Sequence, residues 1–357
     1  MFETLQKNIL SKEDIVTLLS LVGEEQQQLF EHAEKIKLHH VGNNVWLRGL
    51  IELSNICGKD CYYCGIRRSN SHIRRYILSH DDVMQAVKEA YEKGYGSVAI
   101  QSGEITSNDF IHKINKIVVD SKRMTHGEIG ITLSCGEQTE ETYRRWFESG
   151  ADRYLLRIET SSEELYRRLH PNNEKHNYSK RVHALEALRK TGYQVGTGVM
   201  IGLPFQTNEM LADDLLFMKQ SDIDMCGMGP YIEQASTPLY ALRGQLSSLM
   251  ERFCLSLKMV ALLRILMPDI NIAATTALQA IQRDGREQAI RAGANVLMPN
   301  ITPKQYRGDY LLYDNKPVSV NSDGDELLLL EQRLKTIDHK IGYFLQGNSL
   351  HYRNLSK

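Results

Sequence analysis

The chain has 357 residues, of which 43 are basic and 44 acidic, so its formal net charge is -1. Hydrophobic residues make up 42% and charged residues 24%, which excludes a largely disordered chain. The near-zero charge gives no general attraction to nucleic acid or to an anionic membrane. No apolar run reaches the roughly 18 residues of a membrane span, and the N-terminus does not read as a signal peptide. We therefore expect a cytoplasmic protein that binds neither nucleic acid nor membrane.

The predicted elements begin with two helices, one capped by Ser11 over Lys12–Val22 and one over Glu24–Ile36. From Asn44 onward, short apolar runs alternate with amphipathic stretches. The runs predict eight strands, at Val45–Leu53, Ser97–Gln101, Ile129–Ser134, Arg153–Arg157, Gln194–Ile201, Met225–Pro230, Asn271–Ala274 and Asn295–Met298. The helices predicted between them are Ser79–Lys93, Ser107–Asp120, Thr139–Ser149, Ser162–His170, His176–Thr191, Thr207–Gln220, Ser247–Met267 and Asp284–Ala292.

This alternation of strands and helices predicts an α/β fold with parallel strands and right-handed crossovers. Eight strand–helix units over about 255 residues match a (β/α)8 barrel of the TIM type, and a doubly wound sheet is the alternative. We expect a helical extension at 1–43, the barrel at 44–313, and a tail with a C-terminal helix that packs on the barrel at 314–357. Within the tail, Ser319–Asp325 predicts a turn and Glu326–Lys340 a helix. In such a barrel the catalytic residues lie on the loops that follow the strands.

Three of the six cysteines, Cys57, Cys61 and Cys64, lie within eight residues directly after the first predicted strand. Six cysteines are too few for a disulfide scaffold. Three thiolates on one loop can hold a small cluster, but they are one short of a closed zinc site or a fully protein-ligated [4Fe–4S] cluster. The missing ligand leaves one iron open to a molecule with adjacent amine and carboxylate groups. The alternatives are a zinc site completed by a distant ligand such as His72, or buried structural thiols.

The other three cysteines are isolated in the sequence, and isolated cysteines usually pack as small hydrophobic residues. Cys254 falls inside a predicted helix. Cys135 and Cys226 fall at or near predicted strands, so a functional role stays open for these two.

The spacing Cys57-x3-Cys61-x2-Cys64, with Tyr63 before the last cysteine, resembles the signature of the radical S-adenosylmethionine (radical SAM) superfamily. The resemblance implies one [4Fe–4S] cluster that is chelated by S-adenosylmethionine (SAM). One electron from a reducing donor then cleaves SAM and releases a 5′-deoxyadenosyl radical. From about Asn44 to Tyr313 the chain is similar to the HydE family of [FeFe]-hydrogenase maturases, within the biotin-synthase-like group. The similar phrases are Ile51–Arg68, Gln101–Glu104, Ala151–Thr160, Gly198–Pro204, Gly227–Ile232, Ala274–Ala277 and Gly293–Arg307.

Polar residues at the ends of the predicted strands suit a binding site, because a carboxylate accepts hydrogen bonds from ammonium or ribose groups and an arginine grips a carboxylate. The family resemblance implies that Glu104 binds the SAM amino group, Glu159 and Arg181 bind its ribose and carboxylate, and Tyr63 and Ile232 lie at its adenine. It also implies a substrate end lined by Gln101, Ser102, Thr132, Arg157, Thr275, Thr276, Met298, Tyr310 and Tyr313. The alternatives are surface ion pairing for Arg157, ordinary strand positions for the two threonines, and core packing for Met298.

Two departures from the family pattern matter. Some members carry three further cysteines near the C-terminus, but Lys316–Leu330 has none, so only one cluster is expected. Ile158 stands where family members often have histidine, which leaves the fine substrate preference open.

The resemblance implies hydrogenase maturation by radical attack on the sulfur of an iron-bound cysteine complex that carries CO and cyanide. The maturase HydG would supply this small organometallic substrate, and the GTPase HydF would receive the product. The alternative enzyme is a methylornithine synthase-like mutase acting on lysine, and biotin synthase fits less well. A non-catalytic iron–sulfur carrier is a further alternative, but it has no use for Glu104, Glu159 and Arg181, the residues that the resemblance assigns to SAM.

Overall fold

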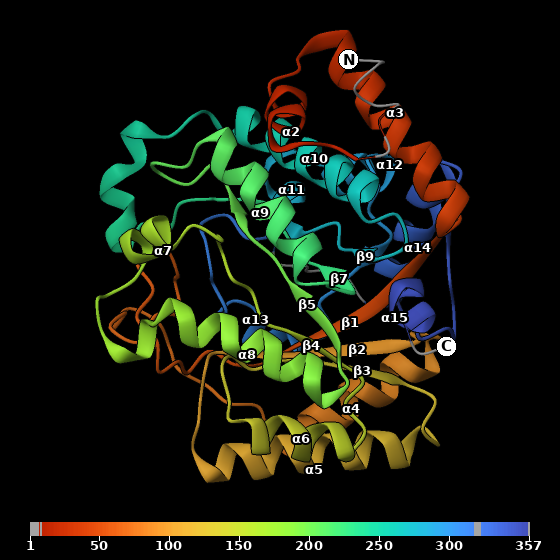
Figure 1. Ribbon diagram of the computed structural model, residues 1–357. Helices are drawn as coiled ribbons and strands as arrows, with labels where there is room; N and C mark the ends of the chain where they lie inside the picture. Colours follow the sequence, from red (N-terminus) through yellow and green to blue (C-terminus); the bar gives the residue numbers. More distant parts are fainter. Residues whose placement is uncertain (1–6, 8, 318–322, 356–357) are drawn as a thin grey trace.

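Among residues 7, 9–317 and 323–355, which the computed structural model describes, eight parallel strands form a ring (Figure 1). The ring closes where Ala273 pairs with Val296 and the Asn295 N–H donates to the Ile272 carbonyl at 2.9 Å. In ring order the strands are β1 (Asn44–Ser54), β2 (Ser97–Ser102), β3 (Gly130–Ser134), β4 (Arg153–Leu155), β5 (Gln194–Thr197), β7 (Met225–Cys226), β9 (Asn271–Ile272) and β10 (Val296–Leu297). The closed ring confirms the predicted barrel and excludes a doubly wound sheet.

The fifth and sixth predicted strands are each interrupted. β5 is followed by the short strand β6 (Met200–Ile201), and β7 by β8 (Gly229–Pro230), and these two short strands pair with each other. Between them the chains approach closely at Gly198, where a Cβ atom would lie 2.0 Å from the carbonyl oxygen of Gly227. Such a contact needs glycine at position 198. This close approach interrupts the continuous fifth strand that the apolar pattern predicts.

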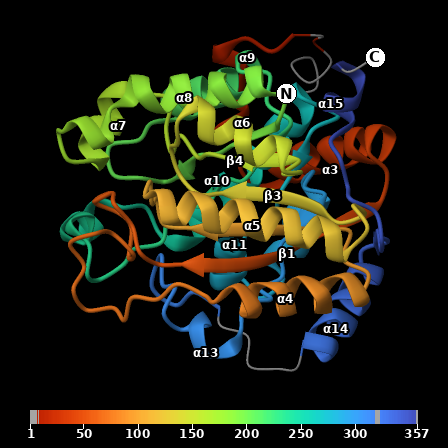
Figure 2. The ribbon, with the colours of Figure 1, turned by 90° about the horizontal axis from the view of Figure 1, so that it is seen from below.

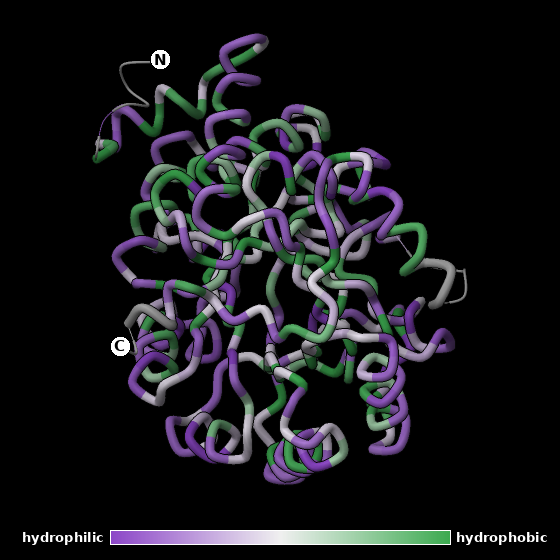
Figure 3. The backbone as a smooth tube through the Cα atoms, turned by 90° about the vertical axis from the view of Figure 1, so that its right-hand side faces the viewer, coloured by the Kyte–Doolittle hydropathy of each residue, from purple (hydrophilic) through white to green (hydrophobic). Residues whose placement is uncertain are grey.

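Helices surround the ring and follow one another around it, as α4, α5 and α6 do in Figure 2. In Figure 3 the outer helices alternate between hydrophobic and hydrophilic residues, as expected when one face packs on the barrel. Their bounds are α4 (His80–Glu92), α5 (Asn108–Met124), α6 (Glu140–Glu148), α7 (Glu163–Leu169), η1 (Glu174–His176), α8 (Tyr178–Thr191), α9 (Asn208–Gln220), η2 (Pro238–Gln245), α10 (Leu249–Leu266), α11 (Thr276–Ile281), α12 (Gly285–Arg291) and α13 (Lys304–Arg307). No helix of the described residues is long and apolar enough to cross a membrane.

The N-terminal extension forms α2 (Lys12–Leu19) and α3 (Gly23–His40), which lie beside α10 (Figure 1). Ser11 caps α2 in a capping box with Asp14, as its sequence position predicts. α10 is buried on nearly all sides, because the barrel covers one side and these two helices cover the other. The extension therefore completes the hydrophobic core of the barrel's outer layer.

The C-terminal segment closes the N-terminal end of the barrel. Its short strand β11 (Lys340–Ile341) pairs with the start of β1. Beyond it, the carbonyl of Gln346 accepts a hydrogen bond from Arg153 at 2.8 Å, and that of Gly347 accepts one from Asn271 at 2.9 Å. Residues 342–349, here called the floor segment, thus seal the barrel interior at the end opposite the βα loops.

The last helices differ from the prediction. α14 spans Asp323–Lys335, so both the first and the last residue of the predicted helix Glu326–Lys340 were wrong. The final helix, α15 (Leu350–Leu355), was not predicted. Ser319–Ser322, the first part of the predicted turn, lies outside the described residues, and its last residues belong to α14. Lys340 belongs to the strand β11. The prediction missed this strand because two residues have too little apolar pattern to mark it.

The floor segment can be tested at Gly96, where a Cβ atom would lie 1.8 Å from the Leu345 carbonyl oxygen. We expect Gly96→Ala to push the floor segment away and to lower the free energy of unfolding by about 1–3 kcal/mol. The measurement is denaturant unfolding, with Gly308→Ala as the control, because a Cβ atom there meets open space. Equal stability of the two variants would show that the floor segment does not pack as described.

A second prediction concerns His351 in α15, whose imidazole lies 2.7 Å from Asp222 and 3.1 Å from Asp269. The hydrogen bond to Asp269, and then that to Asp222, raise the pKa of His351 to about 9. The pKa of His351 in the folded protein thus lies above its ordinary value near 6.5. The stabilisation of the fold by charged His351 is therefore complete below pH 6.5 and is lost as the pH rises through 9.

We expect wild type to exceed His351→Asn by about 1–2 kcal/mol in unfolding free energy at pH 6, and the difference to vanish above pH 9. Denaturant unfolding of both proteins across this range measures the difference. A difference that stays constant with pH would contradict the charged pairing.

Candidate active site

One cavity of about 380 Å³ occupies the barrel interior and reaches the C-terminal ends of the strands. It is lined by every residue that the sequence analysis placed in a site. These are Cys57, Cys61, Tyr63, Cys64, Gln101, Ser102, Glu104, Thr132, Arg157, Glu159, Arg181, Ile232, Thr275, Thr276, Met298, Tyr310 and Tyr313. The structure therefore brings the predicted residues together, while their individual roles stay predictions.

The cysteine loop, residues 55–79, follows β1 and packs against the loop after β2. The backbone N–H groups of Lys59 and Glu104 donate to the Cys57 sulfur at 3.4 and 3.3 Å. At Gly103 a Cβ atom would lie 2.2 Å from the Ile56 carbonyl oxygen, so only glycine permits this contact. The first cysteine is thus held by backbone groups of two neighbouring loops.

The three thiols fit a cationic cluster better than they fit an empty pocket. Burial, and then the neighbouring Cys57, raise the pKa of Cys61 to about 12, and burial raises the pKa of Cys64 well above its usual value. Without a cation such thiols stay protonated, whereas bound metal ions deprotonate their cysteine ligands. The three thiols also leave one position of a four-iron cluster without a cysteine.

The zinc alternative has no support in the structure. Within the described part of the chain, no three His, Cys, Asp or Glu side chains converge on a position for a single metal ion. His72, the distant ligand considered for zinc, is exposed and does not line the cavity. An iron–sulfur cluster does not need this convergence, because its cysteines ligate different irons.

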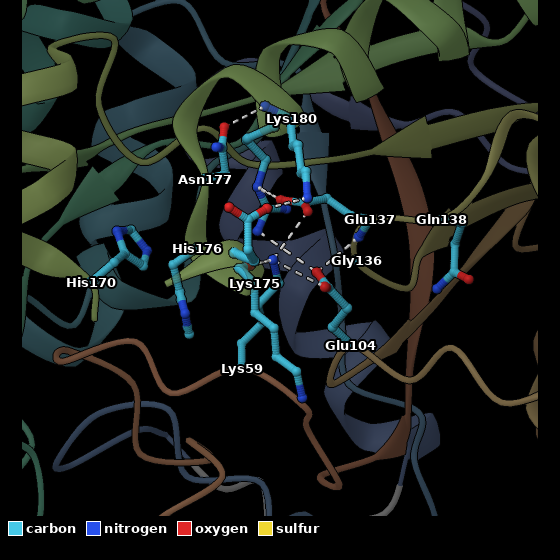
Figure 4. Close-up of polar contacts among 12 residues, drawn as sticks. Lys59, Glu104, Gly136, Glu137, Gln138, His170, Lys175, His176, Asn177 and Lys180 are labelled. Carbon is cyan, nitrogen blue, oxygen red and sulfur yellow. Dashed lines mark hydrogen bonds and ion pairs between the residues drawn. The ribbon is translucent and has the colours of Figure 1, made fainter. Parts of the chain in front are cut away.

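Beside the cysteine loop, four charged side chains form a buried network (Figure 4). Lys59 Nζ lies 3.2 Å from a Glu104 oxygen and 3.0 Å from a Glu137 oxygen. Arg181, in the first turn of α8, places Nε 2.7 Å from Glu137 and a terminal nitrogen 3.7 Å from Glu104. Burial raises the pKa of Glu104, and Arg181 and Lys59 oppose that shift. Glu104 and Arg181 are the pair predicted to hold the amino-acid end of SAM.

Sequence reasoning missed Lys59 and Glu137. Lys59 had one signal, its place between two clustered cysteines, but a single lysine in a loop is usually solvated. Glu137 follows β3 and does not line the cavity, so only its contacts with Lys59, with Arg181 and, through its backbone N–H at 2.8 Å, with Glu104 connect it to the site.

Arg157 and Glu159, predicted for different ligands, bind each other. Arg157 Nε and a terminal nitrogen contact the Glu159 carboxylate at 3.0 and 2.9 Å, and the guanidinium also donates to the Val199 carbonyl at 2.9 Å. Glu159 has φ 68°, a left-handed conformation that is uncommon outside glycine and often marks functional sites. The pair lies at the cavity wall and is not a surface ion pair.

The connection between α7 and α8 braces the cysteine loop. The Tyr63 hydroxyl lies 3.2 Å from His170 Nε2, and the other ring nitrogen lies 2.8 Å from the Tyr166 carbonyl. Burial lowers the pKa of His170 to about 3, so the ring is neutral and accepts the Tyr63 hydrogen bond. The Asp60 N–H donates to His176 Nε2 at 2.9 Å. These contacts fix the tyrosine that was predicted to lie at the adenine.

Some buried polar groups of the cavity wall lack hydrogen-bond partners. The Thr132 and Thr275 hydroxyls have no hydrogen-bond partner among the described residues, although Thr132 is 2% exposed. Gln101 donates to the Tyr310 hydroxyl at 3.2 Å, which orients both side chains. Buried hydroxyls without partners are costly unless a ligand satisfies them.

The deep end of the cavity is cationic. Arg48 on β1 lies about 20 Å along the strand from the cysteine loop, and its contacts are the Met225 sulfur at 3.1 Å and the Gly347 carbonyl. Burial, and then Arg153, lower the pKa of Arg48 well below its usual value. Lys316 also lines the cavity, but it pairs with Glu52 toward the C-terminal end of β1, so the charge at the deep end comes from Arg48. This end therefore favours an anionic or electron-rich group.

The residues outside the prediction are placed as follows. Cys226 lines the cavity, whereas Cys135 and Cys254 pack in the hydrophobic core. Ile158 is buried in the core and does not line the cavity. Ile158, three residues after the end of β4, is thus a packing position here.

Comparison with known proteins gives consistent results. The family model described as the radical SAM superfamily matches residues 51–218. The [FeFe] hydrogenase maturase subunit HydE of Thermotoga maritima is 44% identical over 81% of this chain and 80% of its own. The 3-methylornithine synthase of Methanosarcina acetivorans is 30% identical over 81% and 79%. The crystal structure of a methylornithine synthase superposes with a TM-score of 0.80 and 25% identity, covering 96% and 97%.

The cysteine loop predicts a difference between the clustered and the isolated thiols. After anaerobic reconstitution, we expect Cys57→Ser, Cys61→Ser and Cys64→Ser to lose most of the iron and the absorbance of the cluster, because each removes a ligand. Cys254→Ser is the matched control, since its thiol packs against the core. Iron and sulfide analysis measures the effect, and full iron content in a Cys61→Ser protein would exclude this loop as the cluster site.

Proposed function

This chain belongs to the radical SAM superfamily and to its HydE family, and we propose from that premise that it is an [FeFe]-hydrogenase maturase. The observation that carries the proposal is the placement of three clustered thiols at one end of a cavity that all the predicted ligand-binding residues line. A non-catalytic carrier has no need for such a chamber, and the buried unpaired hydroxyls within it also favour a bound substrate.

In this function, Cys57, Cys61 and Cys64 would hold one [4Fe–4S] cluster, and the remaining iron would take the amino and carboxylate groups of SAM. The reduced cluster, when bound, supplies the electron that converts SAM to methionine and a 5′-deoxyadenosyl radical. Glu104 would accept a hydrogen bond from the SAM amino group, and Arg181 would bind its carboxylate. The other three cysteines of the sequence are isolated, which supports one cluster in the chain.

Around the nucleoside, Glu159 would accept from the ribose hydroxyls, and Tyr63 and Ile232 would enclose the adenine. The hydrogen bonds from Arg157 would hold the Glu159 carboxylate in one orientation. The Tyr63–His170 contact would fix the tyrosine against the ring. The barrel wall and the floor segment would exclude water from the reactive radical carbon and hold the substrate beside it.

We infer that the substrate is a small organometallic complex, an iron-bound cysteine with CO and cyanide, attacked at its sulfur. In this scheme the maturase HydG supplies the complex, HydF receives the product, and a reducing protein donates the electron. The cationic deep end of the cavity supports this choice over lysine, because Arg48 would repel a side-chain ammonium and attract an electron-rich cyanide. The second candidate function is the rearrangement of free lysine by a methylornithine synthase-like reaction. The likeness in fold supports it.

The test is an anaerobic assay with reconstituted protein, SAM and a reductant, in which 5′-deoxyadenosine is measured. We expect formation at least about tenfold above Cys57→Ala, with further stimulation by the iron–cysteine complex. Absence of deoxyadenosine above the Cys57→Ala background would reject both enzyme functions. If lysine stimulates deoxyadenosine formation and the iron–cysteine complex does not, the methylornithine synthase-like function becomes the first candidate.

A further inference from the structure

Arg75 joins the two ends of the chain segment that carries the clustered thiols, residues 55–70, here called the thiol segment. It lies where the cysteine loop returns to the barrel and Ile77 pairs antiparallel with Ser54 at the end of β1. Its guanidinium donates to the Asn55 carbonyl, ahead of the first cysteine, at 2.5 Å. It also donates to four carbonyls that follow the last cysteine, those of Ile66 at 2.8 Å, Arg67 at 2.6 Å, Arg68 at 3.4 Å and Asn70 at 3.0 Å.

Five carbonyl groups that converge on one side chain require the donors of an arginine. A guanidinium carries five N–H groups in a fixed planar fork, whereas a lysine ammonium carries three on a single nitrogen. Four of the five hydrogen bonds are partly buried, so water does not readily replace the guanidinium. Buried carbonyls that lose their donor are costly. Arg75 therefore keeps the two ends of the thiol segment together.

The contacts of the middle of the thiol segment are of another kind, because they reach other loops. The Gly58 N–H donates to the Glu104 carbonyl at 2.8 Å, and the Tyr62 N–H donates to the Leu169 carbonyl at 2.9 Å. These hydrogen bonds fix the segment against the barrel but do not join its ends. The contacts of Arg75 lie within the cysteine loop and need neither iron nor a ligand.

Arg75 also places a positive charge beside the thiols. Burial lowers the pKa of Arg75, and the neighbouring Cys57 and Cys64 oppose that shift, so the guanidinium lies within electrostatic reach of both. No carboxylate of the described residues pairs with Arg75, and its charge is therefore available to the thiolates. Three thiolates make a bound iron–sulfur cluster anionic, and one further electron makes it more so. A fixed cation nearby favours the reduced form.

We propose that Arg75 is a positioning residue of the cluster site, which holds the thiol segment closed before iron binds and whose charge favours the uptake of the electron. This inference rests on the proposed function, in which the three thiols hold one [4Fe–4S] cluster. In the reduction step the cluster accepts one electron from the reducing protein. No bond forms or breaks at Arg75, and its guanidinium stays protonated.

The first measurement is hydrogen–deuterium exchange of the cluster-free protein, which reports the thiol segment in the absence of iron. We expect Arg75→Met to speed exchange over residues 55–70 about tenfold or more, because five carbonyls lose their donor. Arg75→Lys restores some of the donors and should fall between this variant and wild type. Arg74→Met is the matched control, because the Arg74 side chain is 66% exposed and pairs with Asp309. It should exchange like wild type.

The second measurement is the midpoint potential of the reconstituted cluster without SAM, followed by electron paramagnetic resonance. We expect Arg75→Met to shift the equilibrium about tenfold toward the oxidised form, which corresponds to a potential about 59 mV more negative for one electron. Arg75→Lys keeps the charge and should stay near the wild-type potential, although its thiol segment is less firmly held. Arg74→Met should also stay there, because water screens an exposed charge.

Faster exchange in Arg75→Met, with a potential that falls only when the charge is lost, supports the proposal. Exchange like that of wild type overturns it. An unchanged potential in Arg75→Met, or an equal fall in Arg75→Lys, also overturns it, since the charge would then have no role.

If Arg75→Met binds no cluster, exchange of the cluster-free protein and the potential of Arg75→Lys decide by the same criteria. The two levels of the account fail separately. A wild-type protein that binds no cluster after reconstitution would reject the proposed function, whereas the exchange of the cluster-free variants still decides whether Arg75 holds the thiol segment.

Discussion

Closure of eight parallel strands into one ring is the constraint on which the rest of the structure depends. Parallel pairing brings the C-terminal ends of all strands to one rim, so the loops after β1, β2, β3 and β4 face each other although they are far apart in the sequence. The cysteine loop can therefore lean on the loop after β2, and Glu104, Glu137 and Glu159 can approach the same space. The floor segment closes the opposite end, which turns the ring into a chamber.

Compensation of buried charge is the second constraint. Cations and carboxylates line the chamber in pairs, as in Arg157 with Glu159 and Lys316 with Glu52. Arg48 has no carboxylate partner, and the Thr132 and Thr275 hydroxyls have no hydrogen-bond partner among the described residues. All three residues line the cavity. Groups that are costly to bury persist where a ligand completes them, so these positions outline the space that the substrate would fill.

The sequence predicted the features that depend on local pattern. The eight apolar runs and their alternation with amphipathic stretches were sufficient to predict the barrel, and the candidate residues chosen with Cys57, Cys61 and Cys64 line one cavity. Features that depend on distant contacts were missed. β11 is two residues long and exists only because the first residues of β1 extend beyond its pairing with β10, and the breaks in the fifth and sixth strands arise from the contact of Gly198 with Gly227. Lys59 and Glu137 have significance only through their contacts with each other, with Glu104 and with Arg181.

The central claim is that three thiols hold a cluster whose fourth iron binds the amino-acid end of SAM beside Glu104 and Arg181. Electron–nuclear double resonance on the reduced cluster, with SAM labelled by 15N in its amino group and 13C in its carboxylate, tests this most directly. The account predicts hyperfine coupling of both labels to the cluster. An intact cluster with bound SAM that shows coupling to neither label would contradict it.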